Sequence, residues 1–162
     1  AAAAYVRGIE FIQMPTTLLS QVDSSIGGKT GVDCLQYKNM VGAVYMPRMV
    51  YINIHSLLSL PNLQFASGMG EIIKHGLIRD ASYYQWLKDH QAAIQAHDED
   101  VLEEMVYGSC LIKKNVVETD PKEQGIRAYL NFGHTIGHAI EKMSDFSLYH
   151  GQCVAIGMHS GA

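Results

Sequence analysis

Residues 61–77 read Pro61-Asn62-Leu63-Gln64-Phe65-Ala66-Ser67-Gly68-Met69-Gly70-Glu71-Ile72-Ile73-Lys74-His75-Gly76-Leu77, and here the pattern of the chain changes from strand-like to helix-like. Pro61 is suited to the start of a helix, and the apolar residues after it recur at roughly helical spacing. This stretch therefore predicts a helix, and it separates an extended part of the chain from a helical part.

Two short strands are expected before this helix. Residues 8–14 alternate loosely until Pro15, and residues 49–54 form a second β-branched and aromatic run. The domain boundary is expected near residue 55, with the edge of a Rossmann-like α/β domain over residues 1–55 and a mainly α-helical domain over residues 56–162. Two strands are too few for a stable sheet, and the last apolar run, from Val154, resembles an unfinished helix. The chain is therefore expected to be part of a larger protein.

Three further helices are expected within the second part. Asp80 is a candidate cap for the first, and residues 98–117 carry the clearest apolar stripe in the chain. Residues 121–125 form a polar loop. The last of these helices is expected to start near Asn131 and to continue through Met143.

The composition excludes several classes of partner. A net charge of −4 over 162 residues gives no general attraction to nucleic acid or anionic lipid, and 48% apolar residues can form a substantial core. No run approaches the ~20 apolar residues that cross a bilayer, and residues 1–5 lack the features of a signal peptide. The cysteines Cys34, Cys110 and Cys153 are widely spaced, which favours small buried hydrophobes in a reducing cytoplasm.

Three charged or titratable residues share one face of the predicted helix. Glu71, Lys74 and His75 lie at positions i, i+3 and i+4. They could form an ordinary solvated stripe of ion pairs. Against that reading, their neighbours are apolar, and the glycines Gly68, Gly70 and Gly76 each lower helix stability by up to ~1 kcal/mol. Close packing against a ligand is one reason for such glycines.

Candidate metal ligands lie in three separate glycine-containing segments. Glu71, His134 and His150 together have the ligand count of a catalytic zinc site with an open position. His134 and His138 also have the i, i+4 spacing that lets two imidazoles reach one metal. The metalloprotease form of that motif needs a glutamate where Thr135 stands, so its general base is missing. The glycines before these two histidines leave room for a substrate.

A loop rich in glycine and lysine precedes these segments. Residues 23–31 read Asp23-Ser24-Ser25-Ile26-Gly27-Gly28-Lys29-Thr30-Gly31, which resembles the end of a P-loop. The P-loop pattern needs a glycine where Asp23 stands, so that interpretation fails on spacing. Two interpretations remain: an anion site neutralised by Lys29 and Lys38, or a surface hairpin.

Taken together, these segments resemble the 3-dehydroquinate synthase family of the sugar-phosphate cyclase superfamily. The similarity covers nearly the whole chain with its spacing kept. The matching segments are Arg7-Gly8, residues 14–31, Lys38-Asn39-Met40-Val41-Gly42, Gly70-Glu71-Ile72-Ile73-Lys74-His75-Gly76, residues 127–141 and residues 150–158.

The resemblance implies a role for each matching residue. It implies that Glu71, His134 and His150 bind zinc or cobalt, and that Arg7 reaches the substrate phosphate of a neighbouring subunit in a homodimer. The residues implied to contact NAD are Thr16, Thr17, Lys29, Lys38, Ser56, Leu57, Leu58 and Ser59. The residues implied to surround a small phosphorylated sugar acid are Asp23, Asn39, Lys74, Lys113, Arg127, Asn131 and His138.

The activity implied is that of an NAD- and metal-dependent carbon–oxygen lyase, which closes 3-deoxy-arabino-heptulosonate 7-phosphate to 3-dehydroquinate with loss of phosphate. Three alternatives remain. A sister cyclase could make 2-deoxy-scyllo-inosose, a valiolone or an amino-dehydroquinate, although Arg127 and Lys113 suit a substrate carboxylate. An iron-dependent alcohol or glycerol dehydrogenase would share the architecture without needing this phosphate set. A non-catalytic metal-binding domain is the alternative from another class.

The chain departs from the family pattern at several places. Gln152 stands where the family usually has glutamate, which weakens the expected support of His150. Tyr37 occupies the place of a glycine before Lys38. The pyrophosphate loop and the last helices of the family are absent from these 162 residues, so the chain by itself is expected to be inactive.

Overall fold

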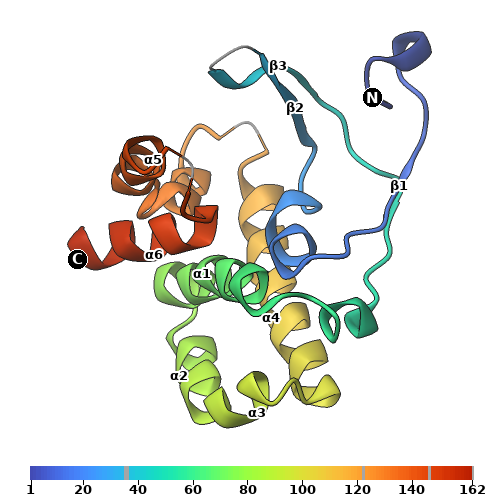
Figure 1. Cartoon of the computed structure of the whole chain (residues 1–162). Coiled ribbons are helices and arrows are strands. Elements are labelled where there is room, and N and C mark those ends of the chain that lie inside the picture. Colours follow the sequence, from blue (N-terminus) through green and yellow to red (C-terminus); the bar gives the residue numbers. More distant parts are fainter. Residues whose placement is uncertain (35–36, 122, 146, 162) are drawn as a thin grey trace.

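The computed structural model describes the chain except residues 35–36, 122, 146 and 162, and it leaves the side chains of residues 33 and 37–39 undescribed (Figure 1). A region with short strands comes first, and a mainly helical region follows, as the sequence predicts. The described strands form two separate two-stranded sheets. β1 (Ile12–Gln13) pairs in parallel with β4 (Met49–Val50), while β2 (Lys29–Cys34) and β3 (Tyr37–Val44) form an antiparallel hairpin.

The helical region consists of α1 (Asn62–Arg79), α2 (Ala81–Asp89), α3 (Gln91–Gln95), α4 (Glu99–Thr119), α5 (His134–Met143) and α6 (His150–Ser160). Shorter helical turns are η1 (Tyr5–Arg7), η2 (Ser20–Ser24), η3 (Ile54–Leu57) and η4 (Ile126–Asn131). Within the described part of the chain, no helix is both long and apolar enough to cross a membrane.

The helices α1, α2 and α4 start where the sequence predicts, and Asp80 is a cap as expected. Pro61 stands directly before α1. The Asp80 carboxylate accepts hydrogen bonds from the backbone N–H groups of Ser82 and Tyr83 at the start of α2, and Asp98 does the same for Val101 at the start of α4. Each carboxylate satisfies N–H groups that a helix leaves unpaired. The predicted helices at these positions are therefore confirmed.

The single helix predicted from Asn131 to Met143 is wrong. The chain forms η4 as far as Asn131 and then begins α5 at His134. Gly133 separates the two with a left-handed backbone, φ 78°, which a residue with a side chain rarely adopts. His134 is therefore the first residue of α5, and Arg127 and Asn131 belong to a different helical turn.

One hydrophobic core takes residues from both sides of the boundary expected near residue 55. Leu18 and Val22 from the first region, with Leu57, pack in the same cluster as residues of α1 and α4. The boundary itself stays a prediction, but this packing ties η2 to the helices. Among the cysteines, Cys153 is buried, while Cys34 is exposed and so does not behave as a buried hydrophobe.

Helix α6 approaches α1 and α5 unusually closely, and glycines permit this. A Cβ atom on Gly151 would lie 1.7 Å from the backbone oxygen of Ser67 in α1, and one on Gly157 would lie 2.1 Å from the backbone oxygen of Gly133. On the facing side, Gly70 and Gly137 lie against the backbone of α6. The expectation that these glycines leave room for a ligand is therefore wrong, because they make room for α6.

The same correction applies elsewhere on α1. A Cβ atom on Gly68 would meet Leu18, and one on Gly76 would meet Tyr84. The glycines of this helix therefore serve contacts between segments of the chain.

We expect Gly151→Ala to lower the free energy of unfolding by about 1–3 kcal/mol or more, because the added methyl group must push α6 away from α1. Denaturant unfolding measures this change. Ala155→Ser is the matched control, because it adds one atom on the exposed side of the same helix. Equal stability of the two variants would contradict the close packing.

Candidate metal and substrate site

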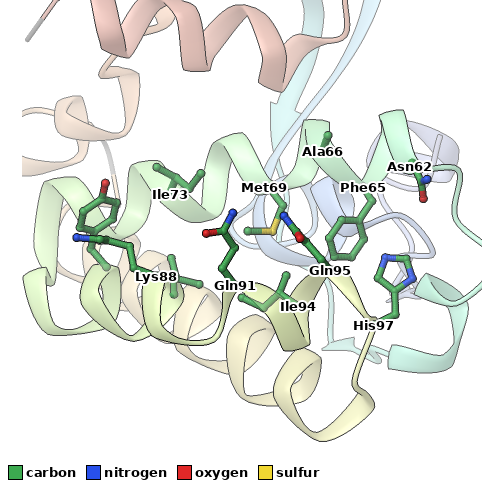
Figure 2. A pocket seen from close by; sticks show the side chains of 12 residues that line it. Asn62, Phe65, Ala66, Met69, Ile73, Lys88, Gln91, Ile94, Gln95 and His97 are labelled. Carbon is green, nitrogen blue, oxygen red and sulfur yellow. The ribbon is translucent and has the colours of Figure 1, made fainter.

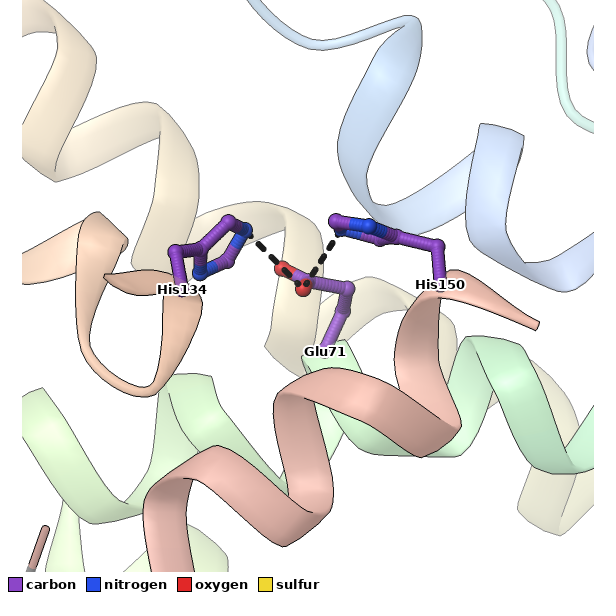
Figure 3. A group of neighbouring side chains, drawn as sticks. All are labelled: Glu71, His134 and His150. Carbon is purple, nitrogen blue, oxygen red and sulfur yellow. Dashed lines mark ion pairs between the residues drawn. The ribbon is translucent and has the colours of Figure 1, made fainter. Parts of the chain in front are cut away.

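Three elements bring Glu71, His134 and His150 together. Glu71 lies in the middle of α1, whereas His134 and His150 are the first residues of α5 and α6 (Figure 3). The Oε1 atom of Glu71 lies 3.7 Å from Nε2 of His134 and 3.8 Å from Nε2 of His150. Ligand atoms of all three lie within 4.8 Å of one another. The spacing of the sequence did not require this convergence, since the residues are far apart along the chain.

This arrangement fits a divalent metal ion. Ligand atoms about 2.1 Å from a tetrahedral zinc lie roughly 3.4 Å apart, close to the two distances seen here. Glu71 is fully buried, and its Oε1 atom has no hydrogen-bond partner among the described residues. A buried carboxylate oxygen without a partner is unfavourable, and a cation would satisfy it. Two imidazoles and one carboxylate also leave a coordination position for a substrate oxygen.

The electrostatics favour the neutral form of the His134 imidazole. Burial lowers the pKa of His134 to about 4, and the nearby Lys74 ammonium acts in the same direction. The neutral form is the one that binds metal. Burial raises the pKa of Glu71, while Lys74, whose ammonium contacts Glu71 Oε2, opposes this shift. A bound cation would likewise stabilise the ionised carboxylate.

The face shared by Glu71, Lys74 and His75 is not a solvated stripe. Their exposed fractions are 0%, 1% and 0%. Nδ1 of His75 is 2.7 Å from the hydroxyl oxygen of Ser109, and its Nε2 has no partner among the described residues. Burial lowers the pKa of His75 to about 3, helped by Lys74. This imidazole is therefore neutral inside the protein.

A second charged pair lies beside the first. The Lys113 ammonium of α4 donates hydrogen bonds to the backbone oxygen and to the carboxylate of Asp23 in η2. Burial would raise the pKa of Asp23, but Lys113 and Lys74 outweigh it and lower the pKa to about 2. Asp23, Glu71 and His75 also lie within 4.8 Å of one another. Since Lys113 and Lys74 already neutralise the two carboxylates, this second group does not need a metal.

The Asp23–Lys113 pair borders a cavity of about 690 Å³ between the β2–β3 hairpin and α4. Lys29 and Arg127 also line it, so cationic side chains from three elements face one space. Arg127 is nearly fully buried and donates to the backbone oxygen of Pro121. The hairpin interpretation of the glycine–lysine loop is confirmed, because Lys29 begins the β2–β3 hairpin. The anion site stays a prediction, and Lys29 lines this cavity.

A different cavity, of about 640 Å³, lies between α1, α2 and α3 (Figure 2). Its lining is mainly apolar, with Phe65, Met69 and Ile94 among the residues. None of the predicted site residues is among the described residues that line it. The predicted site residues therefore lie outside this apolar cavity.

Two residues that the sequence did not single out organise this region. The Glu123 carboxylate pairs with the ammonium of Lys29 and accepts a hydrogen bond from Nδ2 of Asn131 at 3.1 Å. Glu141 of α5 has a carboxylate oxygen 3.9 Å from Nδ1 of His150. Glu141 follows His134 and His138 at i+7 and i+3, so helical spacing was the available signal.

Six of the residues predicted to contact NAD lie in two segments that Gln21 joins, whereas Lys29 and Lys38 lie in β2 and β3. Gln21 Nε2 donates to the backbone oxygen of Asn53 and to the hydroxyl of Ser56, at 3.2 and 3.1 Å, and it approaches the backbone oxygen of Pro15. This links the segment of Thr16 and Thr17 to the Ser56–Ser59 turn. Within these segments Thr16, Leu58 and Ser59 are exposed, Thr17 and Ser56 are half-buried, and Leu57 points into the core.

The remaining predicted residues are placed as follows. The His138 ring centre lies 5.3 Å from that of His134 and 5.8 Å from that of His150. Arg7 lies in η1, apart from the helical region (Figure 1). The side chains of Tyr37, Lys38 and Asn39 lie outside the described residues. Gln152 Oε1 accepts a hydrogen bond from the backbone N–H of Tyr149 and caps α6.

The fold resembles that of solved sugar-phosphate cyclases. The 2-epi-5-epi-valiolone synthase of Streptomyces hygroscopicus subsp. jinggangensis 5008, solved with NAD+ and Zn2+, superposes with a TM-score of 0.89 at 26% identity, over 97% of this chain and 44% of that one. A 2-deoxy-scyllo-inosose synthase with carbaglucose-6-phosphate, NAD+ and Co2+ superposes with a TM-score of 0.84 at 33% identity, over 98% of this chain and 43% of that one.

The family descriptions are more specific. Residues 1–67 match 3-dehydroquinate synthase N-terminal, and residues 68–162 match 3-dehydroquinate synthase C-terminal. The chain belongs to the 3-dehydroquinate synthase family. The 3-dehydroquinate synthase of Syntrophotalea carbinolica is 54% identical over 98% of this chain, and that of Acetivibrio thermocellus is 52% identical over 98%. The chain spans 44% of the length of each.

We expect the buried His75 to make stability depend on pH. Its pKa falls from 6.5 in the unfolded chain to about 3 in the folded protein, so only the unfolded state binds this proton between these values. The contribution is fully present above pH 6.5, and stability falls by up to about 1.4 kcal/mol per pH unit as the pH drops below it. Asparagine keeps a polar group near Ser109 without titrating.

His75→Asn should therefore flatten the dependence of unfolding free energy on pH between pH 6.5 and 4.5, measured by denaturant unfolding. His159→Asn, at an exposed position, is the control and should keep the slope of the unsubstituted protein. Identical slopes for all three proteins would show that His75 does not titrate differently in the folded state.

Proposed function

We propose that the intact protein is a 3-dehydroquinate synthase, which converts 3-deoxy-arabino-heptulosonate 7-phosphate to 3-dehydroquinate and phosphate in the shikimate pathway of aromatic amino acid biosynthesis. The observation that carries the proposal is the convergence of Glu71, His134 and His150 beside the Asp23–Lys113 pair. The identity of 54% over nearly the whole chain supports the same activity.

NAD and a metal ion, zinc or cobalt, are the proposed cofactors. When bound, NAD supplies reversible oxidation of a substrate hydroxyl, and the metal supplies Lewis-acid polarisation of that oxygen. Glu71, His134 and His150 would hold the metal. The segments joined by Gln21, with Lys29, would contact NAD. Support comes from the structural relatives, whose descriptions include NAD+ together with Zn2+ or Co2+.

The cationic side chains would bind the phosphorylated sugar acid. Lys113 and Arg127 line one cavity and are both buried, so their charges act through little water. Arg127 presents a planar fork suited to a carboxylate or phosphate group, and Lys113 adds a point charge. Asp23 stays ionised at neutral pH and would orient Lys113 and accept a hydrogen bond from a substrate hydroxyl. Asn131 of η4 and His138 of α5 would also contact the substrate.

The Glu123 carboxylate would compete with an anionic ligand at the cavity lined by Lys29 and Arg127. It occupies the hydrogen-bonding groups of Lys29 and Asn131. An anionic ligand that used either group would compete with Glu123. Lys29 is exposed and Glu123 is partly exposed, so opening this pair requires little energy.

Two further features belong to the proposal. Arg7 would reach the substrate phosphate of a neighbouring subunit, which makes the protein a homodimer. The cytoplasm is the proposed compartment.

The sister cyclases differ in substrate. 3-Dehydroquinate synthase is favoured because the 52–54% identity to members of that group exceeds the 26–33% identity to the solved valiolone and scyllo-inosose synthases. The two buried cations also suit a substrate that carries both a carboxylate and a phosphate.

Product analysis of the intact protein tests the activity. With NAD and zinc, we expect phosphate release and 3-dehydroquinate from the heptulosonate phosphate, and no turnover of a hexose 6-phosphate that lacks the carboxylate. Lys113→Ala should lower kcat/KM by at least 10²-fold, because it removes a cation and leaves Asp23 unpaired. Turnover of the hexose phosphate alone would assign the protein to the sister cyclases.

Metal content tests the ligand set separately. Glu71→Ala should abolish stoichiometric zinc binding, because it removes the carboxylate ligand, whereas Glu118→Ala on the exposed side of α4 should leave binding intact. Zinc is measured by competition with a chromogenic chelator. Equal affinity of both variants would mean that the metal is bound elsewhere or that the protein is not metal-dependent.

A further inference from the structure

The imidazole of His150 stands between two carboxylates. Its Nε2 faces Glu71 Oε1 at 3.8 Å, and its Nδ1 faces Glu141 Oε2 at 3.9 Å. Glu71 belongs to α1 and Glu141 belongs to α5. Carboxylates from two different helices therefore face the two nitrogens of the His150 ring. A neutral imidazole carries a proton on only one nitrogen, and the partner of the other nitrogen decides which one.

Glu141 is buried although it is a carboxylate. Its exposed fraction is 6%, and it directly follows Ala139 and Ile140 in α5. A charged group in such a place requires a polar partner. The described structure brings two imidazoles to it, because ligand atoms of His138, Glu141 and His150 lie within 4.8 Å of one another.

Gln152 cannot supply this carboxylate. The family usually has glutamate there, but in this chain the position is an amide, and its Oε1 accepts the backbone N–H of Tyr149 at 3.0 Å. The side chain therefore caps α6. Among the described residues, Glu141 has a carboxylate that faces Nδ1 of His150.

We propose that Glu141 is the positioning residue for His150, which rests on the metal site of the proposed function. Oε2 of Glu141 and Nδ1 of His150 lie 3.9 Å apart, an ion-pair distance, and a shift of about 1 Å would let the carboxylate accept the Nδ1–H of His150. The Nε2 lone pair would then be directed toward Glu71 and the cation. The same contact holds the ring orientation and makes Nε2 a better donor to the metal.

The test measures zinc affinity of the intact protein by chelator competition. Glutamine has nearly the same shape as glutamate, so Glu141→Gln removes the charge while keeping the packing. We expect zinc to bind about 10–100-fold more weakly. Glu118→Gln is the matched control, since it removes the same charge at a side chain that is 63% exposed on α4. Unchanged affinity in Glu141→Gln would overturn the proposal.

A second readout does not depend on bound metal. Nitrogen NMR of the metal-free protein should find the proton of His150 on Nδ1, and Glu141→Gln should shift the population toward the Nε2–H form. A purely structural role for Glu141 would leave this tautomer unchanged. Finding the proton of His150 on Nε2 in the unsubstituted protein would also overturn the proposal.

Two comparisons separate the alternatives. If Glu71→Ala leaves zinc binding intact, the metal site itself is wrong, and with it the proposed function. If Glu71→Ala abolishes binding but Glu141→Gln does not weaken it, only the role of Glu141 is wrong. A loss in His138→Ala equal to that in Glu141→Gln, with no further loss in the double variant, would place the effect on His138 and contradict the proposal.

Discussion

The close approach of α6 to α1 and α5 is the contact on which the candidate site depends. At Gly151 the backbone of α6 meets the backbone of Ser67, and at Gly157 it meets Gly133. Because His150 directly precedes Gly151, this approach brings its imidazole to the Glu71 carboxylate. The left-handed Gly133 likewise ends η4 and starts α5 at His134. If side chains instead of glycines lay between α6 and its neighbours, the helices would lie farther apart, and Glu71, His134 and His150 would no longer meet.

The second constraint is the burial of charge. Glu71, Lys74, Lys113 and Arg127 are all buried, and each acid of the site has a base beside it. Such pairs add little net stability, because the loss of hydration opposes the attraction between the charges. Their concentration at one place indicates a binding site for charged groups. Oε1 of Glu71 lacks a hydrogen-bond partner among the described residues, and Lys29, Lys113 and Arg127 line one cavity. The proposed metal site and the proposed anion site therefore lie at different places in this region.

Much of the fold could be predicted from local pattern. The starts of α1, α2 and α4 follow from Pro61, Asp80 and Asp98, since a cap depends on neighbours in sequence. The break at Gly133 could not be predicted in the same way, because the contact that requires glycine comes from α6. The sequence likewise left open whether the helix face of Glu71 and Lys74 is exposed to solvent or packed against another group. Exposure depends on what packs against a helix, and periodicity does not contain that information.

For the site, the sequence by itself determined the kinds of ligand, the glycine-containing segments that carry them and the family to which they belong. Those are properties of residue type and spacing. Only the tertiary structure decided that Glu71, His134 and His150 meet, that Glu123 and Gln21 join separate segments, and that Glu141 faces His150. Contacts between residues distant along the chain depend on helix crossings, and the crossings depend on which backbones can touch.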